Sequence, residues 1–272
     1  MQKTEMRNPD TMNIDKMDTG EILHVINREN MNSVMAVERA IGKIEEACEA
    51  IISGLEGGGR LFYVGAGTSG RLGIVDAAEC PPTFGVSQGL VTGIIAGGKE
   101  SMFAASEGAE DNYGAGAEDL GKYDLRECDT VVGISAAGNA EYILGALAFA
   151  KEKACKTIGI TCNEGSKLDM AADISIVTDT GAEVITGSTR MKAGTAQKLV
   201  LNMLSTTAMI KTGKVYENLM INLKPSNKKL TIRMEGIVTE VLGCDRKRAR
   251  ELLEENDWNL RTILEKYHIG RK

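Results

Sequence analysis

The stretch LFYVGAGTSGRLG, residues 61–73, joins a short apolar run to a glycine-rich loop and then to a helical pattern. An apolar run of this kind is typical of a parallel strand whose two faces are both covered by helices. Glycines let the backbone approach an anion closely, and the amides of a following helix N-terminus donate to phosphate oxygens. We therefore expect Gly67, Thr68, Ser69 and Gly70 to form a phosphate-binding loop.

Apolar runs alternate with helical stretches along the middle of the chain. The other predicted strands are residues 90–96, 130–134, 157–161 and 174–178. This alternation predicts an α/β fold, with a parallel five-stranded sheet flanked by helices. Most of these runs end in Gly, Ser, Thr or Asn, which places the loops at the carboxyl edge, where open α/β sheets bind ligands.

The two ends of the chain are predicted to be helical. Residues 1–55 read as an extended segment followed by two helices that pack on the core, residues 56–224 as the α/β domain, and residues 225–272 as a small helical module. Pro225 begins a polar linker, Gly243 is a plausible helix stop, and Asp245 and Asn256 or Asp257 are plausible helix caps.

Composition narrows the classes of function. A net charge of −6 gives no basic field for nucleic acid or an anionic membrane, and no run of about 18 apolar residues is present. Six scattered cysteines and two histidines suggest neither disulfides nor a metal site. We expect a cytoplasmic protein with reduced thiols and no metal site, whose acid and base chemistry depends on carboxylates.

Two further loops carry groups that can bind an anion. The loop at residues 135–139 offers Ser135 and Asn139 after a predicted strand. A third loop lies at the start of a long helix, residues 193–211, where cations stand beside hydroxyls. Its candidate ligands are Ser188, Thr189, Arg190 and Lys192.

The first loop also has the spacing GxGxxG, which is the dinucleotide fingerprint. A dinucleotide fold usually carries a ribose-binding carboxylate after its second strand, whereas here Gly97, Gly98 and Lys99 follow. A nicotinamide oxidoreductase is thereby weakened as an alternative, although it remains open.

Longer motifs give a more specific result. They are TEMRNPDTMNID at 4–15, GAGTSGRLG at 65–73, DAAECPPTFG at 76–85, EGAED at 107–111 and EVITGSTRMKAGTAQKLVLNMLS at 183–205. In these motifs the chain resembles the N-acetylmuramic acid 6-phosphate etherases, from about residue 4 to the C-terminus.

The resemblance implies a sugar isomerase (SIS) fold, a homodimer with its active site near the subunit interface, and a C-terminal module similar to ubiquitin-associated domains. It also implies that the chain is a carbon–oxygen lyase. Water and N-acetylmuramic acid 6-phosphate would yield N-acetylglucosamine 6-phosphate and D-lactate during peptidoglycan recycling, with no metal or organic cofactor. Glucokinase regulatory proteins resemble the same family, so a non-catalytic sugar-phosphate sensor is the alternative.

The resemblance assigns roles to two glutamates. Glu79 in DAAEC corresponds to the acid that protonates the departing lactate, and Glu110 in EGAED to the second catalytic carboxylate, which we take as the base at C2. The carbonyl of the open-chain sugar acidifies the C2 hydrogen, so a positioned carboxylate can remove it. Burial and a like-charged neighbour are expected to raise the pKa of such a glutamate towards neutrality.

The second loop departs from the family. The related enzymes usually have a sequence of the type SGRTP there, whereas this chain has Ala137, Gly138, Asn139 and Ala140. The family's serine, arginine and threonine are missing, so the contacts with the phosphate must differ at this loop.

The helix at 193–211 predicts a homodimer. It mixes small residues with Leu and Met around much of its surface.

Overall fold

The computed structural model describes residues 2–225 and 227–267. The last residues of the predicted C-terminal module, 268–272, lie outside the described residues, as do Met1 and Ser226. The described chain forms two compact units. The first comprises residues 1–78 and 89–208, and the second comprises 79–88 and 209–272.

The first unit is built on one sheet of five parallel strands in the order β2-β1-β3-β4-β5. The strands are β1 (Leu61–Gly65), β2 (Val91–Ile95), β3 (Thr130–Ile134), β4 (Lys156–Thr161) and β5 (Ile174–Val177). The predicted five-stranded parallel sheet is thus confirmed, with strand ends shifted by a residue or two. Gly65 pairs with Ile95 and Ile134, so the loops after β2, β1 and β3 leave the sheet side by side.

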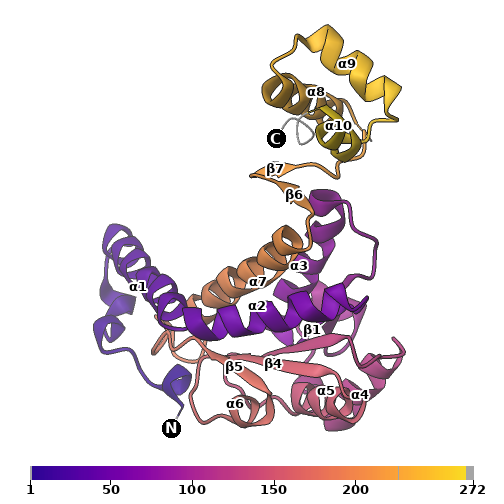
Figure 1. The fold of residues 1–272 in the computed structure, drawn as a ribbon. Helices are drawn as coiled ribbons and strands as arrows, with labels where there is room; N and C mark the ends of the chain where they lie inside the picture. The colour runs from indigo at the N-terminus through magenta and orange to yellow at the C-terminus, as the bar shows by residue number, and fades with distance from the viewer. Residues whose placement is uncertain (1, 226, 268–272) are drawn as a thin grey trace. The chain divides into compact units, whose positions relative to one another are not determined.

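Helices cover both faces of this sheet (Figure 1). One face carries α5 and α6, with α4 packed on α5, and the other carries α2, α3 and α7. Two glycines set these contacts: a Cβ on Gly133 would clash with Ile143 of α5, and one on Gly73 would lie 2.8 Å from Cβ of Tyr63 in β1. The helices are α1 (Thr19–Arg39), α2 (Ile41–Glu56), α3 (Gly67–Phe84), α4 (Tyr113–Gly121), α5 (Glu141–Glu152), α6 (Lys167–Ala171) and α7 (Lys192–Lys211).

The segment before α1 is anchored to the carboxyl edge of the sheet. The backbone N–H of Lys3 donates to Oδ1 of Asn163 at 2.9 Å, and the Asn163 amide donates to the hydroxyl of Thr4 at 3.1 Å. Further along, the Thr11 hydroxyl donates to the carbonyl oxygen of Val184 at 2.9 Å. Asp18 then starts α1 with a capping box that includes Glu21.

The second unit has its own apolar core. It contains a hairpin, β6 (Val215–Tyr216) with β7 (Leu219–Met220), that the sequence reading did not predict. The three predicted helices are present as α8 (Lys228–Leu242), α9 (Arg246–Glu255) and α10 (Leu260–Tyr267). Gly243 ends α8 in a left-handed conformation and Asp245 caps α9, as expected. The cap of α10 is Asn259, not Asn256 or Asp257, because Asn259 Oδ1 accepts from the Thr262 N–H.

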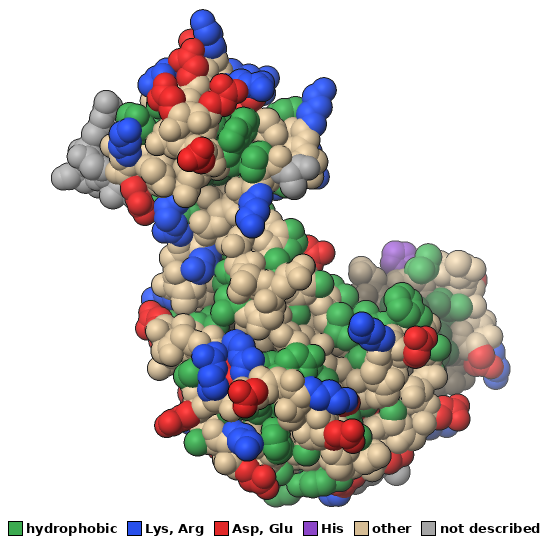
Figure 2. Space-filling view, turned by 90° about the vertical axis from the view of Figure 1, so that its right-hand side faces the viewer, with side chains coloured by type: hydrophobic (Ala, Val, Ile, Leu, Met, Phe, Trp, Pro, Cys, Tyr) green, Lys and Arg blue, Asp and Glu red, His purple; other side chains and the backbone are tan. Residues whose placement is uncertain are grey.

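On the face shown in Figure 2, acidic and basic side chains are interspersed over the surface. Within the described residues, no helix has the length and apolar character needed to cross a membrane.

Candidate active site

The glycine-rich loop after β1 turns directly into α3. Gly67 begins the helix at φ +52°, a conformation that favours glycine. A Cβ on Gly65 would lie 2.5 Å from the backbone nitrogen of Gly70, so the loop also needs glycine for close approach. Thr68 is half-buried, so its hydroxyl can reach a ligand, whereas Ser69 is buried and faces the protein interior.

The loop lines a cavity of 330 Å³ together with the segment that follows β2. The lining residues are Ala66, Gly67, Arg71, Ala96, Ser101 and residues 105–110. Glu110 lies in the short 3-10 helix η5 (Ala109–Asp111), which Gly108 introduces at φ +73°. Two sequence-predicted features, the first loop and Glu110, are therefore brought together at one cavity.

Arg71 is the cation of this cavity, and the sequence reading missed it. Its guanidinium donates to the carbonyl oxygens of Met102 at 3.1 Å and Ala104 at 2.9 Å. No carboxylate of the described residues forms an ion pair with it, so its positive charge stays available to an anion in the cavity. The signal was present, because Arg71 directly follows the glycines of the loop.

The third loop packs against the first. The buried Ser69 hydroxyl donates to Oε1 of Gln197 at 3.0 Å, and a Cβ on Gly194 would lie 3.4 Å from Cγ2 of Thr68. Ser188 and Thr189 are half-buried and Arg190 is exposed, immediately before α7. The first and third loops thus lie side by side, and both carry polar side chains.

Lys192 belongs to the same loop but faces inward. It is 1% exposed, and its ammonium donates to Oε2 of Glu29 at 2.5 Å and to the carbonyl oxygen of Ala182 at 2.6 Å. Glu183 accepts from the N–H groups of Lys192 and Ala193, which satisfies the first turn of α7. In this arrangement the charge of Lys192 fastens the loop to α1.

The second loop lies beside a different cavity. Ser135 is buried and accepts from the Gly138 N–H at 3.0 Å, while Asn139 is exposed and accepts from the Lys167 N–H at 3.3 Å. The cavity next to it measures 520 Å³ and is lined by Gln2, Lys3, Asn139 and residues 163–166. Glu141, in the first turn of α5, forms an ion pair with Lys167.

Glu79 lies near the end of α3, is exposed, and belongs to the second compact unit. Glu110 is exposed too and belongs to the first unit. Both carboxylates are exposed in this chain, so the burial expected from the sequence is not present here.

Asp76 is the buried carboxylate of the DAAEC motif. It accepts from the Tyr63 hydroxyl at 3.1 Å and lies 3.8 Å from the ammonium of Lys198. Burial raises its pKa, while hydrogen bonds from Ser205 and Tyr63 act in the opposite direction. This cluster joins β1, α3 and α7, and so fixes the helix that begins with the first loop.

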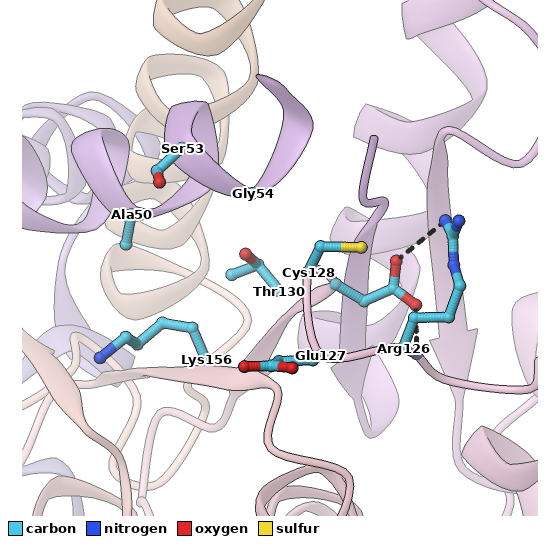
Figure 3. Close-up of a pocket in the computed structure, with 9 residues that line it drawn as sticks. Ala50, Ser53, Gly54, Arg126, Glu127, Cys128, Thr130 and Lys156 are labelled. Carbon is cyan, nitrogen blue, oxygen red and sulfur yellow. Dashed lines mark hydrogen bonds and ion pairs between the residues drawn. The ribbon is translucent and has the colours of Figure 1, made fainter. Parts of the chain in front are cut away.

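A further cavity, of 540 Å³, lies at the opposite edge of the sheet (Figure 3). Thr130 and Lys156, which begin β3 and β4, line it together with Ser53 and Gly54 of α2. No sequence-predicted site residue lies there.

Comparison with known proteins gives the family. A model of the glucokinase regulatory protein N-terminal SIS domain matches residues 43–151, and one of the SIS domain matches residues 113–207. The chain is 50% identical, over 96% of its length and 86% of the relative's, to an N-acetylmuramic acid 6-phosphate etherase of Clostridium beijerinckii. It is 51% identical, over 96% of its length and 85% of the relative's, to one from Caldanaerobacter subterraneus. The chain belongs to the N-acetylmuramic acid 6-phosphate etherases.

Solved structures agree with an etherase built on the SIS fold. A phosphoheptose isomerase from Francisella tularensis superposes with a TM-score of 0.52 at 20% identity, over 71% of this chain and 98% of that one. A phosphoheptose isomerase from Neisseria gonorrhoeae gives a TM-score of 0.51 at 17% identity, over 70% of this chain and 98% of that one. At this identity the likeness concerns the fold alone, which confirms the SIS architecture expected for an etherase.

Proposed function

We propose that this chain cleaves the D-lactyl ether of N-acetylmuramic acid 6-phosphate with water, giving N-acetylglucosamine 6-phosphate and D-lactate. The relatives that carry this name are about half identical over nearly the whole chain. The observation that carries the proposal is Glu110, which lines one cavity together with the glycine-rich loop after β1. A carboxylate beside an anion-binding loop is what proton removal from a sugar phosphate requires.

The reaction is an elimination followed by a hydration. In the open-chain aldehyde, the Glu110 carboxylate removes the C2 proton, and the C2–H electron pair passes towards the carbonyl. The C3–O bond then breaks, and Glu79 protonates the departing lactate oxygen. Water adds to the unsaturated aldehyde at C3 and a proton returns to C2. No redox partner is needed, because the carbon skeleton ends at the oxidation level at which it began.

Binding of the phosphate is assigned to the polar surface of the first and third loops. Gly67 and Thr68 offer backbone and hydroxyl donors at the start of α3, whereas the Gly70 N–H donates to the carbonyl oxygen of Ala66 at 3.2 Å and so shapes the loop. Arg71 supplies a positive charge in the cavity that Gly67 lines. Ser188, Thr189 and Arg190 extend this surface. Ser69 acts by holding Gln197, and Lys192 by holding Glu29, so both position the loops.

The second loop plays a smaller part in this proposal. The two cations beside this loop are both paired with carboxylates, Lys167 with Glu141 and Lys3 with Asp179. A carboxylate at the start of α5 competes with a phosphate for the positive end of that helix.

A homodimer is part of the same proposal. The sequence predicted it from the apolar surface of α7, but the structure supports it through α1 instead. Seven apolar residues of that helix are fully buried within the chain: Ala193, Ala196, Val200, Leu201, Leu204, Ala208 and Met209. Helix α1 has an exposed apolar surface, on which Leu23, Met31, Val34 and Met35 are each at least half exposed, whereas Met203 and Ile210 of α7 are less exposed. Side chains of this size favour burial against a second copy.

Light scattering tests the dimer. The wild-type chain should have twice the mass of the monomer, and Met31→Glu with Val34→Glu should give monomers. Glu38→Ala, on an exposed part of the same helix, is the matched control and should leave the dimer intact. A monomeric wild-type chain at micromolar concentration contradicts this part of the proposal.

Cytoplasmic location completes the proposal, since all six cysteines are free, as expected in a reducing compartment. Cell fractionation against periplasmic markers tests it. The activity itself is tested by incubating the purified chain with N-acetylmuramic acid 6-phosphate and measuring D-lactate. A folded dimer that releases no lactate contradicts the proposed function.

A further inference from the structure

The turn after β2 folds a buried serine back onto the cavity of Glu110. Gly97 and Gly98 both have positive φ values, +80° and +72°, and the short 3-10 helix η4 (Lys99–Met102) follows. Ser101 in this helix is 3% exposed. Its hydroxyl is buried and has no hydrogen-bond partner among the residues that the structure describes. A buried hydroxyl without a partner is unfavourable, so Ser101 retains the capacity for a further hydrogen bond.

Ser106 supplies a second hydroxyl at the same place. A Cβ added to Gly97 would overlap with the Ser101 hydroxyl and would lie 2.8 Å from that of Ser106. The two hydroxyls therefore converge on the Cα of Gly97. Ser101, Ser106 and Glu110 all line the 330 Å³ cavity, but only Ser101 is buried, while Ser106 is exposed.

We propose that Ser106 donates a hydrogen bond to the C1 oxygen of the substrate while Glu110 removes the C2 proton, and that Ser101 orients Ser106 from behind. This inference rests on the proposed etherase reaction. When the C2–H bond breaks, its electron pair forms a C1=C2 double bond and the carbonyl pair moves onto O1. O1 is two bonds from C2, so its donor must share a cavity with the base. A fixed hydroxyl at this position stabilises the charge as it forms.

The same geometry explains why the Ser101 hydroxyl has no hydrogen-bond partner among the described residues. Rotation of Ser106 about its Cα–Cβ bond, towards the cavity, lets Ser101 donate to the Ser106 oxygen while Ser106 donates to O1. Ser101 is then a positioning residue that acts through Ser106. Arg71, the cation in the same lining, is held by two backbone carbonyl oxygens and is assigned to the phosphate.

The experiment compares Ser106→Ala, Ser101→Ala and the double variant. In deuterium oxide, NMR follows exchange of the substrate's C2 hydrogen, and calorimetry gives the dissociation constant of N-acetylglucosamine 6-phosphate. We expect exchange to slow about 100-fold in Ser106→Ala and about tenfold in Ser101→Ala, with binding changed less than threefold. The double variant should match Ser106→Ala alone, because Ser101 has nothing left to orient. Ser53→Ala, in the cavity at the opposite edge of the sheet, should match the wild type.

Other outcomes overturn the inference. Weaker binding of the product and of inorganic phosphate, with unchanged exchange in the bound state, assigns the hydroxyls to the phosphate. Multiplicative effects of the two single changes mean that Ser101 does not act through Ser106. Wild-type rates in both single variants leave the serines without a role, while lactate release by the wild type still supports the proposed function. No lactate and no exchange with the wild-type chain refutes both.

Discussion

Two polar clusters at the carboxyl edge of one sheet have opposite properties. Around Glu110 the carboxylates are exposed, Ser101 has an unpartnered hydroxyl, and Arg71 has no carboxylate partner among the described residues. Lys192 and Glu29 are instead buried and paired: the ammonium bonds to Glu29 and to a backbone carbonyl, and Asn8 donates to the same Glu29 oxygen at 2.7 Å.

The difference shows what distinguishes a site that reacts from contacts that only hold segments of the chain together. A group that must bind a substrate has to keep some of its hydrogen-bonding capacity unused in the free protein. A group that holds segments together has its capacity filled, since a buried charge without a partner is costly. By this criterion we propose that the first cluster binds and reacts, while the second keeps α1 and the loop before α7 in place.

The largest effect is expected from Glu110. Glu110→Gln should reduce lactate release by about 10²–10⁴-fold, because this is the loss expected when a positioned general base is removed. It should suppress exchange of the C2 hydrogen with deuterium oxide as well, since the base acts before lactate leaves. NMR of the substrate measures both rates.

Glu79→Gln is the matched comparison, since Glu79 is also an exposed glutamate. If elimination is stepwise, this variant should lose lactate release but keep the exchange, because the leaving group needs its acid only after C2 is deprotonated. Exchange that persists in Glu110→Gln and vanishes in Glu79→Gln would reverse the two assignments.

The second effect concerns the buried pair. Lys192→Met should lower the free energy of unfolding by about 3–5 kcal/mol, because Glu29 then keeps its charge in the interior without a cation. Adding Glu29→Gln should recover part of the loss. Urea unfolding at neutral pH measures each value.

Lys167→Met provides the control. Its ammonium also lies 2.5 Å from a carboxylate, Glu141, yet the side chains are 57% and 36% exposed, against 2% and 8% for Lys192 and Glu29. An exposed pair contributes about 0–1 kcal/mol. Equal losses in the two variants would mean that burial does not distinguish these clusters.

The sheet was predictable because its signals are local. A strand buried on both faces must be an apolar run, and residues 130–134 coincide with β3 as predicted. Helix caps are local too, which is why Asp245 was found. The hairpin at 215–220 was missed because each of its strands has two residues, too few to show any periodicity.

The candidate site was only partly predictable. The glycine-rich loop and Glu110 were identified by motif, and they share one cavity. The inward direction of Lys192 depends on Glu29, which is 163 residues away along the chain, and no local pattern carries that information. Ser101 was missed for the same reason, since its lack of a partner is a property of the folded chain.

A third effect, at the opposite edge of the sheet, concerns Asp129. Burial alone would raise the pKa of Asp129, but hydrogen bonds from Arg60 and the backbone of Arg126 lower it below the usual aspartate value. Its contribution to stability is thus complete above about pH 4 and is lost as the pH falls through the lower folded pKa. Asp129→Asn should lower the free energy of unfolding by about 2 kcal/mol at pH 7, and by less at pH 3.

Unfolding of Asp129→Asn and the wild type in urea, from pH 3 to pH 7, measures this dependence. Glu127→Gln, an exposed carboxylate lining the same cavity, should behave like the wild type throughout. A difference between Asp129→Asn and the wild type that is constant with pH would contradict the assigned cause.

The smallest effect is expected at the second loop. Asn139→Ala removes a neutral, exposed side chain whose oxygen accepts from the Lys167 N–H at 3.3 Å. A neutral hydrogen bond from this side chain to the ligand would contribute about 0.5–1.5 kcal/mol, and exposure favours the lower end of that range. Affinity for N-acetylglucosamine 6-phosphate should therefore fall about threefold in Asn139→Ala. Arg71→Gln, in the cavity of Glu110, should weaken binding at least tenfold, because it removes a charge. If calorimetry instead found the larger loss at Asn139, the phosphate would lie at the second loop, and the two cavities would have to exchange roles.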